Sequence, residues 1–150
     1  MSVAERLEAL GFVLPGEMQL PPGVEISFQW VRVSGNSALI SGHGALAADG
    51  SAAGPFGKVP SEVPLEQAQE STRLATLAML ASLDRSLGSL DQVSSWLMVS
   101  GFVNADPGYA QTTLVINPAR TCSSACTARN GAHRRARRWE SRPHRSTCLS

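Results

Sequence analysis

The chain has 150 residues, of which 43% are hydrophobic and 17% charged, and a formal net charge of +1. A chain of this length and composition can form one domain with a real core. It has no run of about eighteen apolar residues and no basic N-terminal segment followed by an apolar one. We therefore expect neither a membrane span nor a secretory signal, and predict a cytoplasmic protein.

The small net charge conceals two parts of opposite sign. Residues 1–120 contain 6 Lys and Arg against 11 Asp and Glu, a charge of −5. Residues 121–150 contain 7 Lys and Arg against 1 Asp or Glu, a charge of +6. An acidic body steers phosphates away, which argues against a nucleic-acid partner.

The N-terminal residues predict a short helix followed by a linker. Ser2-Val-Ala-Glu5 is typical of a capping box, in which both side chains satisfy free backbone N–H groups. We expect a helix over Val3–Leu10, ended by Gly11. Leu14–Gly23 contains three prolines, which forbid a regular strand ladder, and so predicts an extended connector.

A β-hairpin is predicted next. Apolar and polar residues interleave in Ser27–Val33, and Gly35-Asn36 separates this run from the apolar stretch Ser37–Ser41. Both turn residues tolerate a positive φ, which tight hairpin turns require. Ala45–Lys58 follows as a Gly, Ala and Asp loop, long enough to be functional or mobile.

The clearest pattern is an amphipathic helix between Pro64 and Gly88, which suit a helix start and a helix stop. Its apolar residues recur every three or four positions, as on one helical face. They are Leu65, Ala68, Thr72, Ala75, Met79, Leu83 and Leu87.

Val93–Val103 reads as a strand. Ser37–Gly42 lies before the long helix and Val93–Val103 after it, and a strand on each side of a helix implies a parallel pair joined by a right-handed crossover. Alternation places Trp96, Met98 and Phe102 on one face and Leu97, Val99 and Val103 on the other, so both faces are apolar. One layer of helices covers only one face, so we expect another subunit to cover the second.

In this order, residues 14–117 resemble the RidA/YjgF family, also labelled endoribonuclease L-PSP. The resemblance rests on Gly35-Asn36, Ser41-Gly42, Gly57-Lys58-Val59, Leu65-Glu-Gln, Leu90-Asp-Gln-Val93, Gly101-Phe-Val-Asn104 and Val115-Ile-Asn117. It implies an α+β, chorismate-mutase-like fold with a mixed sheet covered by helices. It also implies a cytoplasmic homotrimer that binds a small-molecule substrate and needs no cofactor.

The resemblance also implies an activity. Family members are hydrolases that deaminate enamines and imines such as 2-aminoacrylate to keto acids and ammonia. By position, Ser41 and Gly42 would line the substrate pocket and Asn117 would face it. Phe28 stands where many members have tyrosine, which removes a hydroxyl. The alternative is a non-catalytic small-molecule-binding role, or an RNA- or translation-related role.

The resemblance stops after Asn117, and residues 121–150 show neither a helical stripe nor strand alternation. Read across codon boundaries from Arg120, the codons permit S-D-L-L-V-R-L-Y-G-P-E-R-G-A and later A-A-P-P-V-D-V-P-V, as a family member would have. We infer a one-base frameshift near Arg120. This predicts an incomplete domain over residues 1–120 and an irregular, exposed, disordered tail over 121–150.

The frameshift removes the residues on which catalysis in the family depends. An arginine that holds the substrate carboxylate would arise across the codons of Arg135 and Ala136, and a glutamate that orients water would lie beyond Ser150. No catalytic residue can be assigned, and whether the chain is an enzyme stays open. An inactive, poorly folded product that fails to trimerise is a further alternative.

Three other sequence patterns have both a functional and a structural interpretation. His43 beside Ser41 could be a base, a pocket residue or a structural histidine, and no acid partner is visible. Basic His133–Arg138 could attract phosphates, but a solvated tail is favoured. The remaining cysteines and histidines match no zinc-site spacing, so no metal is predicted. They are Cys122, Cys126, Cys148 and His144.

Overall fold

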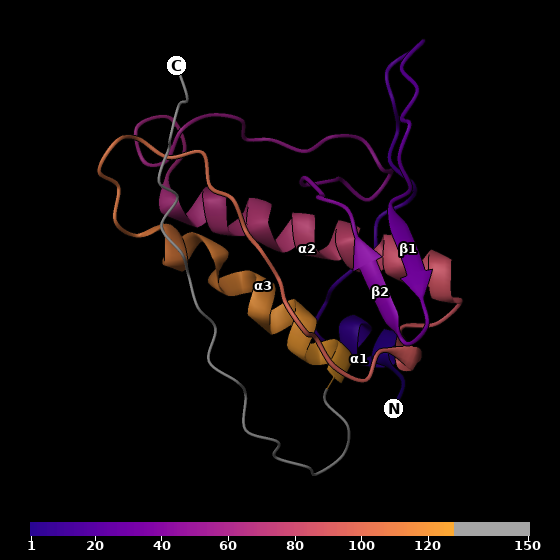
Figure 1. The fold of residues 1–150 in the computed structure, drawn as a ribbon. Helices are drawn as coiled ribbons and strands as arrows, with labels where there is room; N and C mark the ends of the chain where they lie inside the picture. Colours follow the sequence, from indigo (N-terminus) through magenta and orange to yellow (C-terminus); the bar gives the residue numbers. More distant parts are fainter. Residues whose placement is uncertain (128–150) are drawn as a thin grey trace.

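The structure is a computed structural model, and it describes residues 1–127. It is a small α+β domain (Figure 1). Its elements are α1 (Val3–Ala9), β1 (Val31–Ser34), β2 (Ser37–Ile40), α2 (Leu65–Leu87), the 3-10 turn η1 (Leu90–Gln92) and α3 (Thr112–Thr127). Helices α2 and α3 pack side by side, α1 packs against α3, and the hairpin lies over the C-terminal half of α2.

The predicted ends of the first two helices are confirmed. At α1, the Ser2 hydroxyl accepts from the Glu5 N–H at 3.2 Å and a Glu5 carboxylate oxygen accepts from the Ser2 N–H at 2.6 Å. At α2, Pro64 precedes the first turn, and Gly88 has a φ of +78° and donates to Asp84 at 2.7 Å. Only glycine takes such a left-handed backbone without strain.

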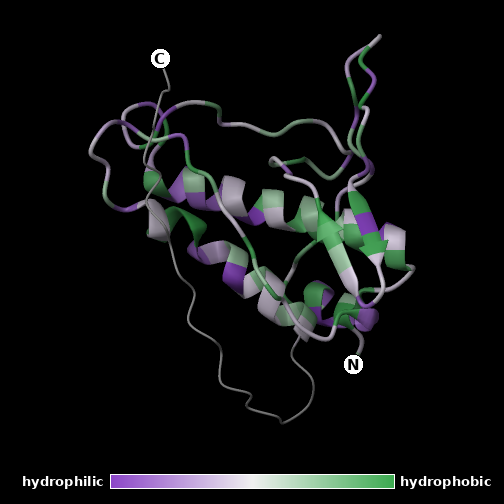
Figure 2. Ribbon diagram, viewed as in Figure 1, coloured by the Kyte–Doolittle hydropathy of each residue, from purple (hydrophilic) through white to green (hydrophobic). Residues whose placement is uncertain are grey.

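The β-hairpin is confirmed, with a shorter first strand than predicted. Val31 pairs with Ile40 at one end and Ser34 with Ser37 at the other. Gly35 has a φ of +55° while Asn36 does not have a positive φ, as in a type II′ turn. β2 becomes hydrophobic toward its end (Figure 2), where Ile40 packs on the core while Leu39 is 66% exposed.

The predicted strand Val93–Val103 is wrong, and so is its parallel pairing with Ser37–Gly42. Within the described chain these residues join no ladder, and the nearest parallel contact is an isolated bridge between Val59 and Ala105. A strand forms only where another strand lies beside it, and this segment instead runs over α3. The Trp96 indole N–H donates to the Ser123 carbonyl at 2.8 Å.

The predicted division of this segment into two alternating faces is also wrong. Val93, Trp96, Val99 and Val103 are the half-buried residues, and the first three of them recur every third position. A spacing of three is that of an extended polyproline-like chain rather than a pleated strand. Leu97 and Met98 between them are 84% and 83% exposed.

The prediction that residues 121–127 are irregular and exposed is wrong, because α3 continues to Thr127. Its buried residues are small and spaced by three or four: Val115, Ala119, Cys122, Ala125 and Cys126. They let α3 approach α1 and α2 closely. The rest of the predicted tail, residues 128–150, lies outside the described residues, and the frameshift and the domain division stay predictions.

Two buried clusters hold the described part together. The larger joins α1, α2 and α3 through Val3, Leu7, Leu77, Leu80, Leu83, Leu90, Cys122, Ala125 and Cys126. The smaller lies at the start of α2 and contains Val59, Val63, Ala68 and Val115. Within residues 1–127, no helix is long and apolar enough to cross a membrane.

Candidate functional site

Histidine 43 ties the end of the hairpin to α2. Its Nδ1 lies 2.7 Å from the Ser41 carbonyl oxygen, and its Nε2 lies 2.8 Å from the Ser82 hydroxyl on α2. A carbonyl oxygen only accepts hydrogen bonds, so the geometry assigns the proton of the neutral ring to Nδ1. Nε2 then accepts from Ser82. The serine bonded to His43 through its side chain is thus Ser82 and not Ser41.

Arg85 completes this network. It donates to the Ser82 hydroxyl oxygen at 3.1 Å and to the Pro15 carbonyl at 3.3 Å. Burial lowers the pKa of His43, and the positive charge of Arg85 lowers it further, against the opposing hydrogen bond to Ser41. The ring is therefore neutral near pH 7. Because Ser82 is only 6% exposed, a bound substrate would not reach it, and the arrangement favours a structural histidine.

Phe28 and Ser41, two of the predicted site residues, gather at the same end of the hairpin. The Ser41 N–H donates to the Trp30 carbonyl at 2.9 Å, and its hydroxyl donates to Gln29 at 2.8 Å. Phe28 meets Trp30 edge to face with ring centroids 4.9 Å apart, and Trp30 lies 4.8 Å from the His43 ring. The result is a half-exposed aromatic wall beside Ser41, the residue that follows β2.

Gly42, the next residue, has open space where a side chain would stand. A small molecule can therefore approach the backbone at this point. The sequence singled out Phe28, Ser41 and Gly42, and the structure adds Trp30 and Ser82 to the same region. Trp30 was not among the predicted site residues, and nothing local in the sequence connects Ser82 to this region.

Asn117, the fourth predicted site residue, lies elsewhere, on α3. It lines a cavity of about 340 Å³ between α2 and α3, with Gln69 and Arg73 of α2 on the wall. The remaining lining residues are Phe12, Pro118, Thr121 and Cys122. None of the three hairpin residues lines this cavity, so one copy of residues 1–127 does not bring Asn117 together with them.

Pro118 shapes this cavity. It lies inside α3 and has no N–H, so the Leu114 carbonyl four residues earlier loses its helical partner. The Gln69 side-chain amide of α2 donates to that carbonyl at 2.9 Å. This bond links the two helices at the cavity wall.

Arg73 is the cation that lines the cavity, and no sequence pattern singled it out. Its Nε donates to the Glu70 carboxylate at 2.8 Å, its Nη2 bonds the other oxygen, and its guanidinium lies 5.4 Å from the Phe12 ring centroid. The hydrogen bond to Glu70 raises the pKa of Arg73 and lowers that of Glu70. A Glu–Arg pair three residues apart was a visible signal, but such pairs are common on helix surfaces.

The two described cysteines are free thiols on the buried face of α3. Burial raises the pKa of Cys122, and raises that of Cys126 to about 11. Both are therefore protonated and weak nucleophiles near neutral pH. Within residues 1–127, no three His, Cys, Asp or Glu residues gather as metal ligands.

Solved structures share this fold, among them the following two. Protein Atu1372 from Agrobacterium tumefaciens, of unknown function, matches with a TM-score of 0.72 and 26% identity over 85% of this chain and 75% of that one. A Shewanella oneidensis MR-1 protein described as "a putative endoribonuclease" matches with a TM-score of 0.74 and 20% identity over 85% and 81%. No protein-family model and no curated protein matches the sequence.

Proposed function

We propose that this protein is a RidA-like hydrolase that deaminates small enamine or imine carboxylates of the 2-aminoacrylate type to keto acids and ammonia. The observation that carries the proposal is the fold shared with the Shewanella protein, because endoribonuclease is also a label of the family that the motifs resemble. The open backbone at Gly42, beside Phe28 and Ser41, supports a small-molecule pocket at the end of the hairpin.

The proposal includes assembly of several copies, with a homotrimer as the expected form. Asn117 lies away from the hairpin end in a single copy. A substrate cleft that uses Phe28, Ser41, Gly42 and Asn117 would therefore need residues of two subunits. The exposed side chains of Leu97 and Met98 support such an assembly, because large apolar groups on a surface favour burial against a partner.

The test compares the chain as it stands with a frame-restored variant altered after Arg120. Each is added to an enzyme reaction that releases 2-aminoacrylate, and ammonia and keto acid are followed with time. The restored variant is expected to accelerate release, while the present chain, without the arginine and the glutamate that the family uses, is expected to be slow. A restored variant that gives no rate above buffer contradicts the proposal, and sequencing the gene across the Arg120 codon checks the frameshift itself.

RNA cleavage is the second candidate, favoured by the description of the Shewanella protein. The charge of −5 on residues 1–120 opposes it, since an acidic surface repels phosphates. The test incubates labelled single-stranded RNA with the full chain and with residues 1–120. It distinguishes RNA cleavage by the domain from RNA binding by the C-terminal residues. Cleavage by both forms would favour a nuclease. Binding lost on truncation would belong to the basic C-terminal residues.

A further inference from the structure

We propose that the groove between α2 and α3 binds a small organic carboxylate through Arg73. The site is separate from the hairpin end and does not depend on the proposed hydrolysis. The groove is open to solvent, and its volume of about 340 Å³ lies at the lower end of the size range of small-molecule sites.

The polar residues of the groove form two facing pairs. Gln69 and Arg73 lie four residues apart on α2, and Asn117 and Thr121 lie four residues apart on α3. Residues at this spacing share one face of a helix. Among residues 1–127, the side chains of Asn117 and Thr121 take part in no hydrogen bond that would compete with a ligand. The groove therefore offers an amide and a hydroxyl opposite a cation.

Arg73 has donors to spare. A guanidinium carries five N–H groups, and Glu70 takes one from Nε and one from Nη2. The Nη1 group and the second Nη2 hydrogen remain, and together they can grip a second carboxylate with two parallel hydrogen bonds. Glu70 and the ring of Phe12 hold the guanidinium in place, so little side-chain entropy is lost when a ligand binds.

The Glu70 pair does not cancel the attraction for an anion. The side chain of Glu70 is 51% exposed, and ion pairs at the surface contribute only about 0–1 kcal/mol because water screens them. A ligand carboxylate can thus share Arg73 with Glu70 by binding the donors that Glu70 leaves free. The bond from Gln69 to the Leu114 carbonyl keeps the opposite wall in position.

The remaining lining residues of the groove determine which uncharged part a bound carboxylate can have. Phe12 and Pro118 offer apolar surface, and Cys122 is an uncharged thiol because burial raises its pKa. No negative charge from Cys122 therefore repels an anion. This lining fits a carboxylate attached to a compact aromatic or aliphatic group, and benzoate is a suitable probe.

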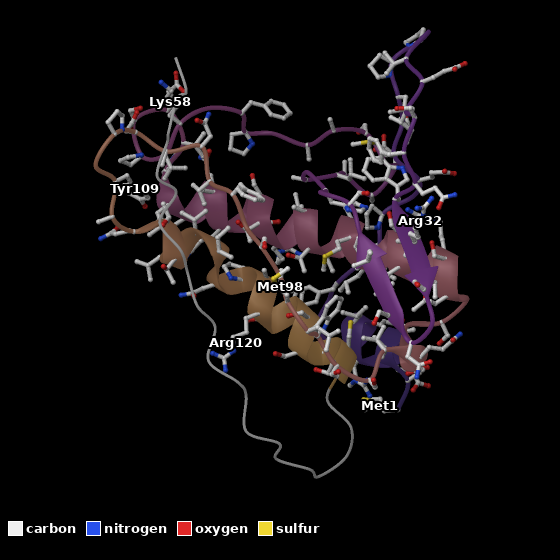
Figure 3. The ribbon with its side chains drawn as sticks, viewed as in Figure 1. Met1, Arg32, Lys58, Met98, Tyr109 and Arg120 are labelled. Carbon is white, nitrogen blue, oxygen red and sulfur yellow. The ribbon has the colours of Figure 1, made fainter. Side chains whose placement is uncertain are left out.

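The experiment titrates benzoate into the full 150-residue chain and follows proton–nitrogen correlation NMR spectra near pH 7. We expect saturable shifts at residues of the groove at millimolar concentration, and none with benzyl alcohol, which has a similar body without the charge. Arg73→Gln should weaken binding by at least about tenfold. Arg120→Gln is the matched control, because it removes the same charge from α3 at a side chain that points away from α2 (Figure 3).

Two further variants keep the test decisive if Arg73→Gln fails to fold. Arg73→Lys keeps the charge without the fork and should bind with intermediate affinity. Asn117→Asp places a carboxylate opposite Arg73 and should weaken benzoate binding. Lack of saturable shifts in the unaltered chain at about 10 mM benzoate would overturn the proposal. Equal affinity in the Arg73 and Arg120 variants would do the same, and because no turnover is measured, the result is independent of the hydrolase assay.

Discussion

The contact between Gln69 and Leu114 exists, in this structure, because Pro118 cannot donate to Leu114. This predicts that the side chains of Gln69 and Pro118 are energetically coupled although they do not hydrogen-bond each other. Proline inside a helix costs about 3 kcal/mol relative to alanine, and an ordinary hydrogen bond contributes about 0.5–1.5 kcal/mol. Pro118→Ala restores an N–H at that position and should raise the free energy of unfolding by about 2 kcal/mol or more.

The coupling appears when Gln69 is removed in both backgrounds. With Pro118 present, Gln69→Ala leaves the Leu114 carbonyl without its protein partner and should cost about 1 kcal/mol. In the Pro118→Ala background the carbonyl accepts from the restored backbone N–H within the helix, so the same change should cost close to nothing. The expected coupling energy is thus about 1 kcal/mol, above the deviation of about 0.3–0.5 kcal/mol that independent sites show in such cycles.

Urea unfolding of the four chains, followed by far-UV circular dichroism, measures this cycle. Gln67→Ala is the matched control, since Gln67 is an exposed residue of α2 and its change should be neutral in both backgrounds. If Gln69→Ala costs the same free energy with and without Pro118, the reasoning is wrong. A Pro118→Ala chain less stable than the parent would show that Pro118 does not lie in a helix interior.

Three other predictions follow from the described core and its titratable groups. Because the pKa of His43 is lowered in the folded state, folding stability should be full above the unfolded value of about 6.5 and decline as pH falls below it; His43→Gln should reduce this slope in urea titrations at several pH values. Leu80 is 0% exposed, so Leu80→Ala should cost about 2–5 kcal/mol in the same assay, and a cost below about 1 kcal/mol would contradict its place in the core. In a Cys148→Ser chain, iodoacetamide should modify Cys122 and Cys126 slowly until urea unfolds the protein, and fast labelling without urea would contradict their burial and raised pKa values.

Local sequence determined the features that depend on neighbouring residues. The capping box of α1, the ends of α2 and the turn at Gly35 each involve groups only a few residues apart. Such interactions form in the same way whatever the rest of the chain does. They were therefore predictable from spacing and residue type.

The tertiary structure decided the features that need a distant partner. Val93–Val103 has the composition of a strand, but a strand forms only beside another, and here the segment packs on α3 through Trp96. Residues after Arg120 look polar in sequence, yet Cys122 and Cys126 become core residues because α1 and α2 cover them.

The candidate groove shows the same division. Asn117 was singled out by resemblance, but Arg73 is far from it in sequence and gains its place only when α2 packs against α3. An isolated Glu70–Arg73 pair looks like ordinary helix surface. Two features turn this pair into a candidate site. They are Phe12, which follows α1 in the chain, and the Leu114 carbonyl, which Pro118 leaves free for Gln69. No spacing rule contains that information, because it depends on the distances between helices that are set by the packing of the core.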